Sequence, residues 1–142
     1  MDPIDRGKDL ILIVDDHDDT RELFAELLAF DGFSVLSAAT GGDALALVRE
    51  HQPCLVLLDL GLPDIAGLEL VLRLRAEPNT ATVPIYALSG FTNLRSAALA
   101  AGIDGFLIKP VTGSELRTIV GQHCTPQPPP LAAEPMPLPP SA

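Results

Sequence analysis

The chain has 142 residues and a formal net charge of −10 at pH 7, because 19 acidic residues outweigh nine basic ones. Its length favours one domain, and 47% hydrophobic with 20% charged residues is typical of a globular protein rather than a disordered one. The acidic balance argues against direct binding to nucleic acid, whose phosphates would repel the chain. No apolar run approaches the roughly 18 residues of a membrane span, and the N-terminus lacks the features of a secretory signal. We therefore expect a cytoplasmic protein without membrane insertion.

Two cysteines, Cys54 and Cys124, are too few for a disulfide framework. Their spacing matches no common metal site either. The simplest interpretation is that both are reduced thiols of a cytoplasmic protein.

Composition divides the chain into a folded body and two ends. Residues 125–142 hold eight of the fourteen prolines. Proline at this density favours an extended chain, because it fixes φ and removes backbone donors. We interpret residues 1–7 as an N-terminal extension, 8–122 as the folded domain and 123–142 as a Pro-rich extended tail or linker. A linker is favoured over a ligand for an SH3-type domain on composition alone.

Within the folded body, short apolar runs alternate with amphipathic stretches. In chain order, the sequence predicts a strand at 10–14, a helix at 20–30, an edge strand at 33–37, a helix at 40–51, a strand at 54–58, a helix at 65–75, a strand at 85–88, a helix at 93–101, a strand at 106–108 and a helix at 112–121. Continuous apolar runs such as LILIV are typical of strands buried on both faces. The alternation predicts an α/β fold, a (βα)5 doubly wound five-stranded parallel sheet.

Local signals support several helices. Thr40 and Thr112 each open a sequence that resembles a capping box, TGGD and TGSE. The first helix is expected to bury one apolar face, formed by Leu23, Phe24, Leu27 and Leu28.

Polar side chains follow four of the five predicted strands. Asp15 and Asp16 follow the first strand, Asp59 the third, Ser89 the fourth and Lys109 the fifth. Ligands of open α/β sheets bind beyond the C-terminal ends of the strands. We therefore expect all five side chains to meet in one cleft.

Each of these residues has a structural alternative. Asp15 or Asp16 could cap the first helix, although Asp18 and Asp19 suit that position better. Asp59 and Ser89 could be turn residues.

Lys109 is harder to explain as a structural residue. It is one of only two lysines and ends a buried strand, where an unpaired ammonium is costly, so it needs a carboxylate partner. Three crowded carboxylates repel one another unless a cation binds, and an oxygen-only site suits Mg²⁺ or Mn²⁺ rather than Zn²⁺. A cation beside a lysine and a hydroxyl could hold a phosphoryl group, with one carboxylate as the nucleophile.

Four motifs make the chain resemble the receiver domain of two-component response regulators. They are IVDD at 13–16, LLDLGLP at 57–63 with Gly67, LSG at 88–90 and GFLIKP at 105–110. The resemblance covers residues 10 to about 120 and implies a flavodoxin-like strand order, 2-1-3-4-5.

The resemblance also implies roles for the acidic residues. Asp59 would be the phosphoacceptor and receive a phosphoryl group from a histidine kinase or a histidine phosphotransfer protein. Asp16, Asp59 and the backbone carbonyl of Gly61 would bind Mg²⁺ (or Mn²⁺) directly, and Asp15 would act mainly through a bound water.

The remaining motifs imply the binding of the phosphoryl group and a switch. Ser89 would donate to a phosphoryl oxygen, and Lys109 would pair with the acyl phosphate. The peptide bond between Lys109 and Pro110 would be cis, which would aim the ammonium into the cleft. Phe106 would occupy the switch position, where many relatives have tyrosine. The surface of the fourth helix, fifth strand and fifth helix would then change and signal to a downstream protein. Such a domain catalyses only its own phosphoryl transfer and slow autodephosphorylation.

Two other interpretations agree less well with the sequence. A phosphatase of the haloacid-dehalogenase type also uses an aspartyl nucleophile, but that nucleophile lies in an Asp-x-Asp motif after the first strand and its acidic pair comes late in the chain. In this sequence the acidic pair, Asp15 and Asp16, comes first. A degenerate, phosphorylation-independent receiver is disfavoured, because every expected position is filled. The sequence leaves open whether the chain is a stand-alone regulator or the receiver of a hybrid kinase or longer regulator.

Overall fold

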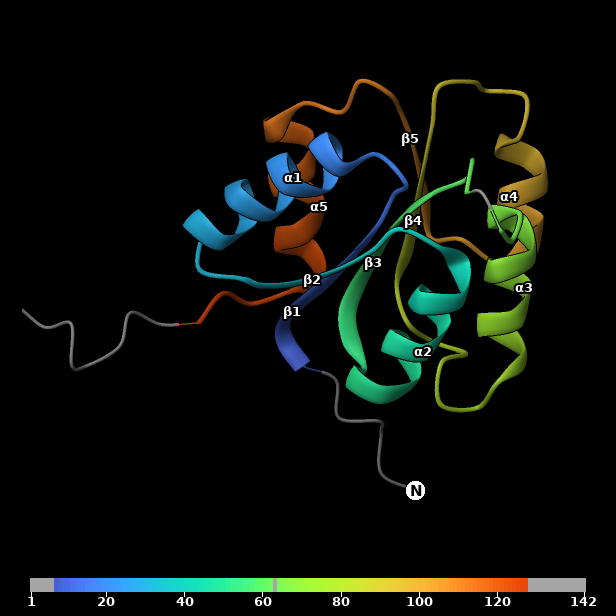
Figure 1. Ribbon diagram of the computed structural model, residues 1–142, viewed down its shortest axis with the longest axis horizontal. Coiled ribbons are helices and arrows are strands. Elements are labelled where there is room, and N and C mark those ends of the chain that lie inside the picture. Colours follow the sequence, from blue (N-terminus) through green and yellow to red (C-terminus); the bar gives the residue numbers. More distant parts are fainter. Residues whose placement is uncertain (1–6, 63, 128–142) are drawn as a thin grey trace, which may run out of the picture.

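The computed structural model describes residues 7–62 and 64–127, which form strands and helices in strict alternation (Figure 1). The strands are β1 (Gly7–Val14), β2 (Ser34–Ala38), β3 (Pro53–Asp59), β4 (Ile85–Ser89) and β5 (Gly105–Ile108). The helices are α1 (Asp18–Phe30), α2 (Gly41–His51), α3 (Gly67–Ala76), α4 (Arg95–Ala101) and α5 (Gly113–His123). All pairings are parallel, in the order β2-β1-β3-β4-β5. The doubly wound fold and its strand order are confirmed, with β2 at an edge.

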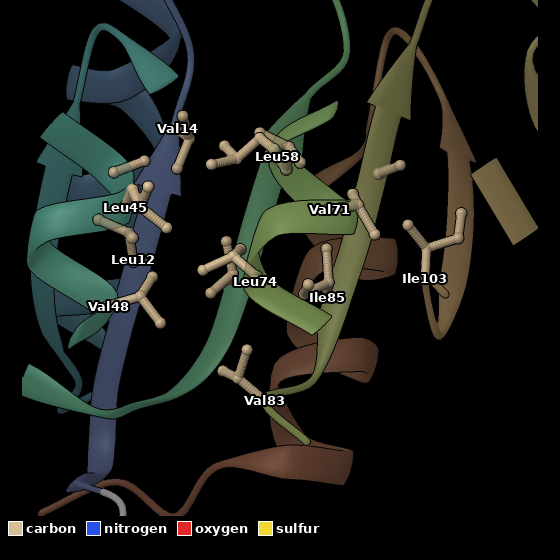
Figure 2. Close-up of a cluster of buried hydrophobic side chains, with 14 of the residues drawn as sticks. Leu12, Val14, Leu45, Val48, Leu58, Val71, Leu74, Val83, Ile85 and Ile103 are labelled. Atoms are coloured by element: carbon tan, nitrogen blue, oxygen red, sulfur yellow. The ribbon is translucent and has the colours of Figure 1, made fainter. Parts of the chain in front are cut away.

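Helices cover both faces of the sheet. Figure 1 shows α1 and α5 on one side and α2, α3 and α4 on the other. On the second side, Leu12 and Val14 of β1 and Leu58 of β3 pack in one cluster with Val48 of α2 and Leu74 of α3 (Figure 2). All five side chains are fully buried.

The opposite face has its own core. Ile11 and Ile13 of β1 and Leu57 of β3 pack there in a cluster that includes Phe24 of α1 and Leu116 of α5. Successive side chains of a strand point to opposite faces, so β1 and β3 supply apolar residues to both clusters. This double burial explains why their sequences are continuous apolar runs.

The predicted caps of two helices are present. The Thr112 side chain accepts from the Glu115 backbone N–H at 3.1 Å, and the Glu115 carboxylate accepts in return from the Thr112 backbone, which completes a capping box at α5. Thr40 Oγ1 accepts from the Asp43 backbone N–H at 3.2 Å and caps α2.

Helix α1 departs from its prediction in two ways. Its N-cap is His17, whose side chain makes no capping bond, so Asp18 and Asp19 lie in the first turn instead of capping the helix. Their negative charges still interact favourably there with the positive end of the helix dipole. Leu23 is 62% exposed, so the buried face of α1 consists of Phe24 and Leu28, with Leu27 partly buried against the same cluster.

Cys54 and Cys124 form a disulfide, so the expectation of two free thiols is wrong. Cys54 lies near the start of β3 and Cys124 directly after α5, 70 residues later, with their Cα atoms 5.6 Å apart. Helix α5 packs on the face of the sheet that carries Cys54, and this tertiary contact brings the two residues together. The spacing of the two cysteines in the sequence does not indicate this contact.

The chain after α5 stays close to the domain as far as residue 127. The Thr125 backbone N–H donates to Lys8 O at 2.8 Å, and Gln127 N–H donates to Gly32 O at 3.0 Å. The rest of the predicted Pro-rich tail lies outside the described residues, as does the N-terminal extension apart from Gly7, which begins β1. Among the helices of the described part, none is long and apolar enough to cross a membrane.

Candidate functional site

The C-terminal ends of β1, β3, β4 and β5 carry the five predicted polar residues. Asp15 directly follows β1, Asp59 and Ser89 are the last residues of β3 and β4, and Lys109 directly follows β5. Parallel strands end at the same edge of a sheet, as Figure 1 shows for this one. Asp15 is fully buried, and Asp59 and Ser89 are each only 6% exposed. Side chains that are up to 94 residues apart in sequence are thereby brought together.

Lys109 lies between two buried carboxylates. Its Nζ is 3.2 Å from Asp15 Oδ2 and 3.3 Å from Asp59 Oδ2. Burial by itself would lower the pKa of Lys109, but the charges of the two aspartates raise the pKa above its ordinary value. The lysine therefore has the carboxylate partners that its burial requires.

Asp15 is held in its ionised form by its neighbours. Burial alone would raise its pKa, but hydrogen bonds from His17 and the charge of Lys109 outweigh burial and lower the pKa below its usual value. The His17 backbone N–H donates to Asp15 Oδ1 at 2.9 Å.

His17 was not selected from the sequence, yet its ring joins the cluster. Its Nδ1 lies 2.9 Å from Asp15 Oδ1 and 3.2 Å from Asp16 Oδ1. The hydrogen bond with Asp15 raises the pKa of His17, and the charge of Asp16 acts in the same direction. The one signal in the sequence was its position directly after the acidic pair.

The cluster offers a divalent cation a set of ligands. Carboxylate oxygens of Asp15, Asp16 and Asp59, together with Nδ1 of His17, all lie within 4.8 Å of one another. The Asp16 side chain is 34% exposed, which leaves access for water. Hard carboxylate oxygens with room for water suit Mg²⁺ or Mn²⁺. The residues present therefore fit such an ion.

The turn after β3 folds back on Asp59. The Gly61 backbone N–H donates to Asp59 Oδ1 at 3.1 Å, while Lys109 is near Oδ2 of the same carboxylate. Both oxygens of Asp59 thus have a hydrogen-bonding or ionic partner, which orients the carboxylate in the cleft.

Ser89 and Phe106 lie on adjacent strands, Ser89 at the end of β4 and Phe106 within β5. Ser89 Oγ accepts from the Phe91 backbone N–H at 3.1 Å, so its hydroxyl proton is available to a ligand. Phe106 is paired with Ala87 in the β4–β5 register, and its partly buried ring packs against the cluster beneath α2, α3 and α4. The peptide bond between Lys109 and Pro110 is cis.

Comparison with known proteins identifies the family. The response regulator receiver domain matches residues 11–121, so the chain belongs to the response regulator receiver domain family, a family of signalling domains of two-component systems. Phosphorylation and Mg²⁺ binding at an acidic pocket are typical of this family. Membership confirms the resemblance drawn from the four motifs, and the haloacid-dehalogenase interpretation has no support left.

Individual relatives agree with this assignment. The chain is 38% identical over 121 residues to an uncharacterized 14.6 kDa protein of Leptolyngbya boryana, covering 84% of this chain and 92% of that protein. It is 34% identical over 109 residues to the probable transcriptional regulator ycf27 of Porphyridium aerugineum, covering 77% of this chain and 45% of the regulator. The chain spans just under half the length of several such regulators.

Solved structures show the same architecture. Chemotaxis protein CheY4 of Vibrio cholerae superposes with a TM-score of 0.77 at 26% identity, covering 82% of this chain and 99% of CheY4. The receiver domain of the sensor histidine kinase PA1611 from Pseudomonas aeruginosa superposes with a TM-score of 0.75 at 28% identity, covering 82% and 98%. The PA1611 structure has a magnesium ion coordinated in its active site cleft.

Proposed function

We propose that this chain is a phosphorylation-activated receiver and that Asp59 is its phosphoacceptor. The observation that carries the proposal is the position of the Asp59 carboxylate. It ends β3 at 6% exposure, lies 3.3 Å from the Lys109 ammonium and shares a cluster with Asp15 and Asp16. A carboxylate with these neighbours can act as a nucleophile toward a phosphoryl group whose charge is neutralised on several sides.

In the proposed reaction, an oxygen of Asp59 attacks the phosphorus of a phosphohistidine. The donor would be a cytoplasmic histidine kinase or histidine phosphotransfer protein. The O–P bond forms as the P–N bond breaks, and the electron pair remains on the imidazole nitrogen, which takes up a proton. Lys109 would pair with the transferred phosphoryl group, and the Ser89 hydroxyl would donate to one of its oxygens. Beyond this transfer and its own slow dephosphorylation, the domain would turn over no substrate.

We further propose that Asp16, Asp59 and the backbone carbonyl of Gly61 hold Mg²⁺ directly and that Asp15 acts mainly through a bound water, with Mn²⁺ as a substitute. The bound cation would supply positive charge to the oxygens of the phosphoryl group. The oxygen-rich set of ligands supports this assignment. So does the magnesium ion in the cleft of the similar PA1611 receiver.

The signal would leave through the face formed by α4, β5 and α5. Phosphorylation adds negative charge and acceptor oxygens at Asp59, and these would attract the Ser89 hydroxyl. A shift of Ser89 would open space into which the Phe106 ring can turn. Leu99 and Ile108, 48% and 42% exposed, give this face apolar surface for a downstream protein. Direct binding to nucleic acid is not part of the proposal, given the net charge of −10.

Acetyl phosphate provides the test, because attack by Asp59 would release acetate and leave one phosphoryl group on the protein. Intact-mass measurement should show this adduct on the wild type with Mg²⁺ and little of it in EDTA. The Asp59→Asn variant should stay unmodified. Asp43→Asn, which changes an exposed carboxylate in the first turn of α2, is the matched control and should react like the wild type. Modification of Asp59→Asn at the wild-type rate would contradict the assignment.

A further inference from the structure

We propose that His17 is an additional ligand of the divalent cation, so that the site combines carboxylate oxygens with an imidazole nitrogen. This inference rests on the proposed function, because it concerns the same cation site. It gives the residue after the acidic pair a role in selecting the metal.

The candidate ligand atoms are spaced closely enough to share one ion. Nδ1 of His17 lies 2.9 Å from Asp15 Oδ1 and 3.2 Å from Asp16 Oδ1. Adjacent ligand atoms around an octahedral ion with bonds of about 2.1 Å are separated by about 3.0 Å. The nitrogen therefore stands at about the distance from the Asp16 carboxylate that a neighbouring ligand of the same ion would have.

The polar contacts of the His17 ring are with the acidic pair and not with the start of α1. His17 is the N-cap of α1, yet its side chain makes no capping bond. The ring is 67% exposed, and its Nδ1 lies within 3.2 Å of carboxylate oxygens of both Asp15 and Asp16. Serine, threonine, aspartate or asparagine would stabilise this helix end better. A poor cap whose ring turns toward two carboxylates is consistent with a binding role.

Two hydrogen bonds at Asp15 fix the backbone from which the His17 ring extends. The Asp15 carboxylate accepts from the His17 backbone N–H at 2.9 Å, and the guanidinium of Arg21 donates to the Asp15 carbonyl at 2.8 Å. These two bonds hold the turn between β1 and α1. The His17 side chain is thereby directed to the cleft from a fixed backbone position.

Binding requires the neutral ring with its proton on Nε2, so that the lone pair of Nδ1 is free. Solvent can hydrate Nε2–H of that tautomer because the ring is largely exposed.

An imidazole ligand has a consequence for metal preference. Nitrogen ligands favour transition metals, whereas Mg²⁺ is best served by oxygen. Replacing His17 with serine should therefore weaken Mn²⁺ binding by about tenfold and Mg²⁺ binding by less than about threefold. Serine is a good N-cap, so this variant keeps the start of α1.

The direct test is pulsed electron paramagnetic resonance of Mn²⁺ bound to the unphosphorylated protein. The wild type should show the coupling of a directly bound ¹⁴N, and labelling histidine with ¹⁵N should change it accordingly. His17→Ser should lose the coupling. His51→Gln, which alters an exposed histidine at the end of α2, should keep it.

Two failures are distinguishable. If Mn²⁺ binds in a manner abolished by Asp16→Asn but shows no directly bound nitrogen, His17 is not a ligand and the proposed function stands. If Mn²⁺ does not bind the wild type, or Asp16→Asn leaves binding unchanged, the cation site itself is wrong, and the role of His17 falls with it.

Discussion

Asp15 has the largest number of fixed contacts in the site. Its two carboxylate oxygens are taken by His17 and Lys109, and its backbone carbonyl accepts from Arg21. It is fully buried, whereas the side chain of the adjacent Asp16 is 34% exposed. Two consecutive aspartates thus have different surroundings: Asp15 organises the cleft, and Asp16 faces the solvent from which the proposed cation would arrive.

Asp16→Asn tests whether the carboxylates are crowded. Lys109 brings one positive charge to the carboxylates of Asp15 and Asp59, so with Asp16 the cluster keeps an excess of negative charge that a cation would balance. Neutralising Asp16 should raise the melting temperature in EDTA, because relief of the repulsion should increase the free energy of unfolding by an amount on the order of 1 kcal/mol. The same change should remove the stabilisation that Mg²⁺ confers on the wild type. Thermal unfolding in EDTA and in Mg²⁺ measures both effects, and a lower melting temperature in EDTA would show that the charges do not repel.

Sequence reasoning found the site residues that end strands, because the topology alone brings strand ends together. Asp59, Ser89 and Lys109 could be named for that reason. His17 could not be found in this way. Whether its ring turns back to the carboxylates depends on the extended backbone of the cap residue (φ −88°, ψ 117°) and on the bond from its N–H to Asp15, neither of which a spacing rule contains.

At the scale of elements, one arginine joins α3 to two connections of the sheet. The Arg75 guanidinium donates to Gly102 O at 2.9 Å, to Ala81 O at 3.0 Å and to Val83 O at 2.6 Å. Its remaining nitrogen is 3.0 Å from Asp104 Oδ2. The end of α3 therefore holds the chain entering β4 and the chain leaving α4.

Arg75→Met should destabilise the domain by about 2–4 kcal/mol, because three carbonyls lose the donor that Arg75 supplies and the Asp104 carboxylate loses its ionic partner. Arg73→Met is the matched control on the same helix. Its guanidinium is half exposed and pairs with Glu69 one turn away, so its loss should cost at most about 0.5 kcal/mol. Urea unfolding of both variants measures the difference. Equal losses would show that the Arg75 contacts add nothing beyond a surface ion pair.

The start of a helix could be predicted where its capping contact lies within the first turn, and the prediction was wrong where the contact comes from a distant part of the chain. Thr40 and Thr112 act within their own turns, and α2 and α5 begin directly after them. Helix α3 begins two residues later than predicted. The carboxylate of Asp64 accepts from the backbone N–H groups of Gly41 and Gly42 at 2.7 and 3.0 Å, so this part of the loop serves the start of α2 instead. A contact across 23 residues leaves no local signal.

At the scale of the whole molecule, the proposed switch runs from the cleft to one outer face. Phe106 has no hydroxyl to anchor either ring position, so packing alone would bias it, with a difference between the two states of a few kcal/mol at most. Beryllofluoride, which mimics a bound phosphoryl group, should therefore shift NMR signals in α4, β5 and α5 as well as around Asp59.

Phe106→Leu separates the two parts of that response. The variant should keep the shifts around Asp59 and lose most of those in α4 and α5. If the wild-type shifts stay confined to the cleft, or if Phe106→Leu leaves the distant shifts intact, this route to the output face is wrong.

The disulfide between Cys54 and Cys124 turns half of the molecule into a covalent ring. This ring contains Asp59, Ser89 and Lys109, and it stays closed in the unfolded chain, where a loop of about 70 residues is worth roughly 4 kcal/mol of stability. Strand β1 is outside the ring, although it is inserted between β2 and β3 in the sheet. The acidic pair that follows β1 can reach the proposed phosphoacceptor only once that strand has docked. The proposed cation site is thus completed by the non-covalent docking of β1, and binding of the cation would report that this strand is in place.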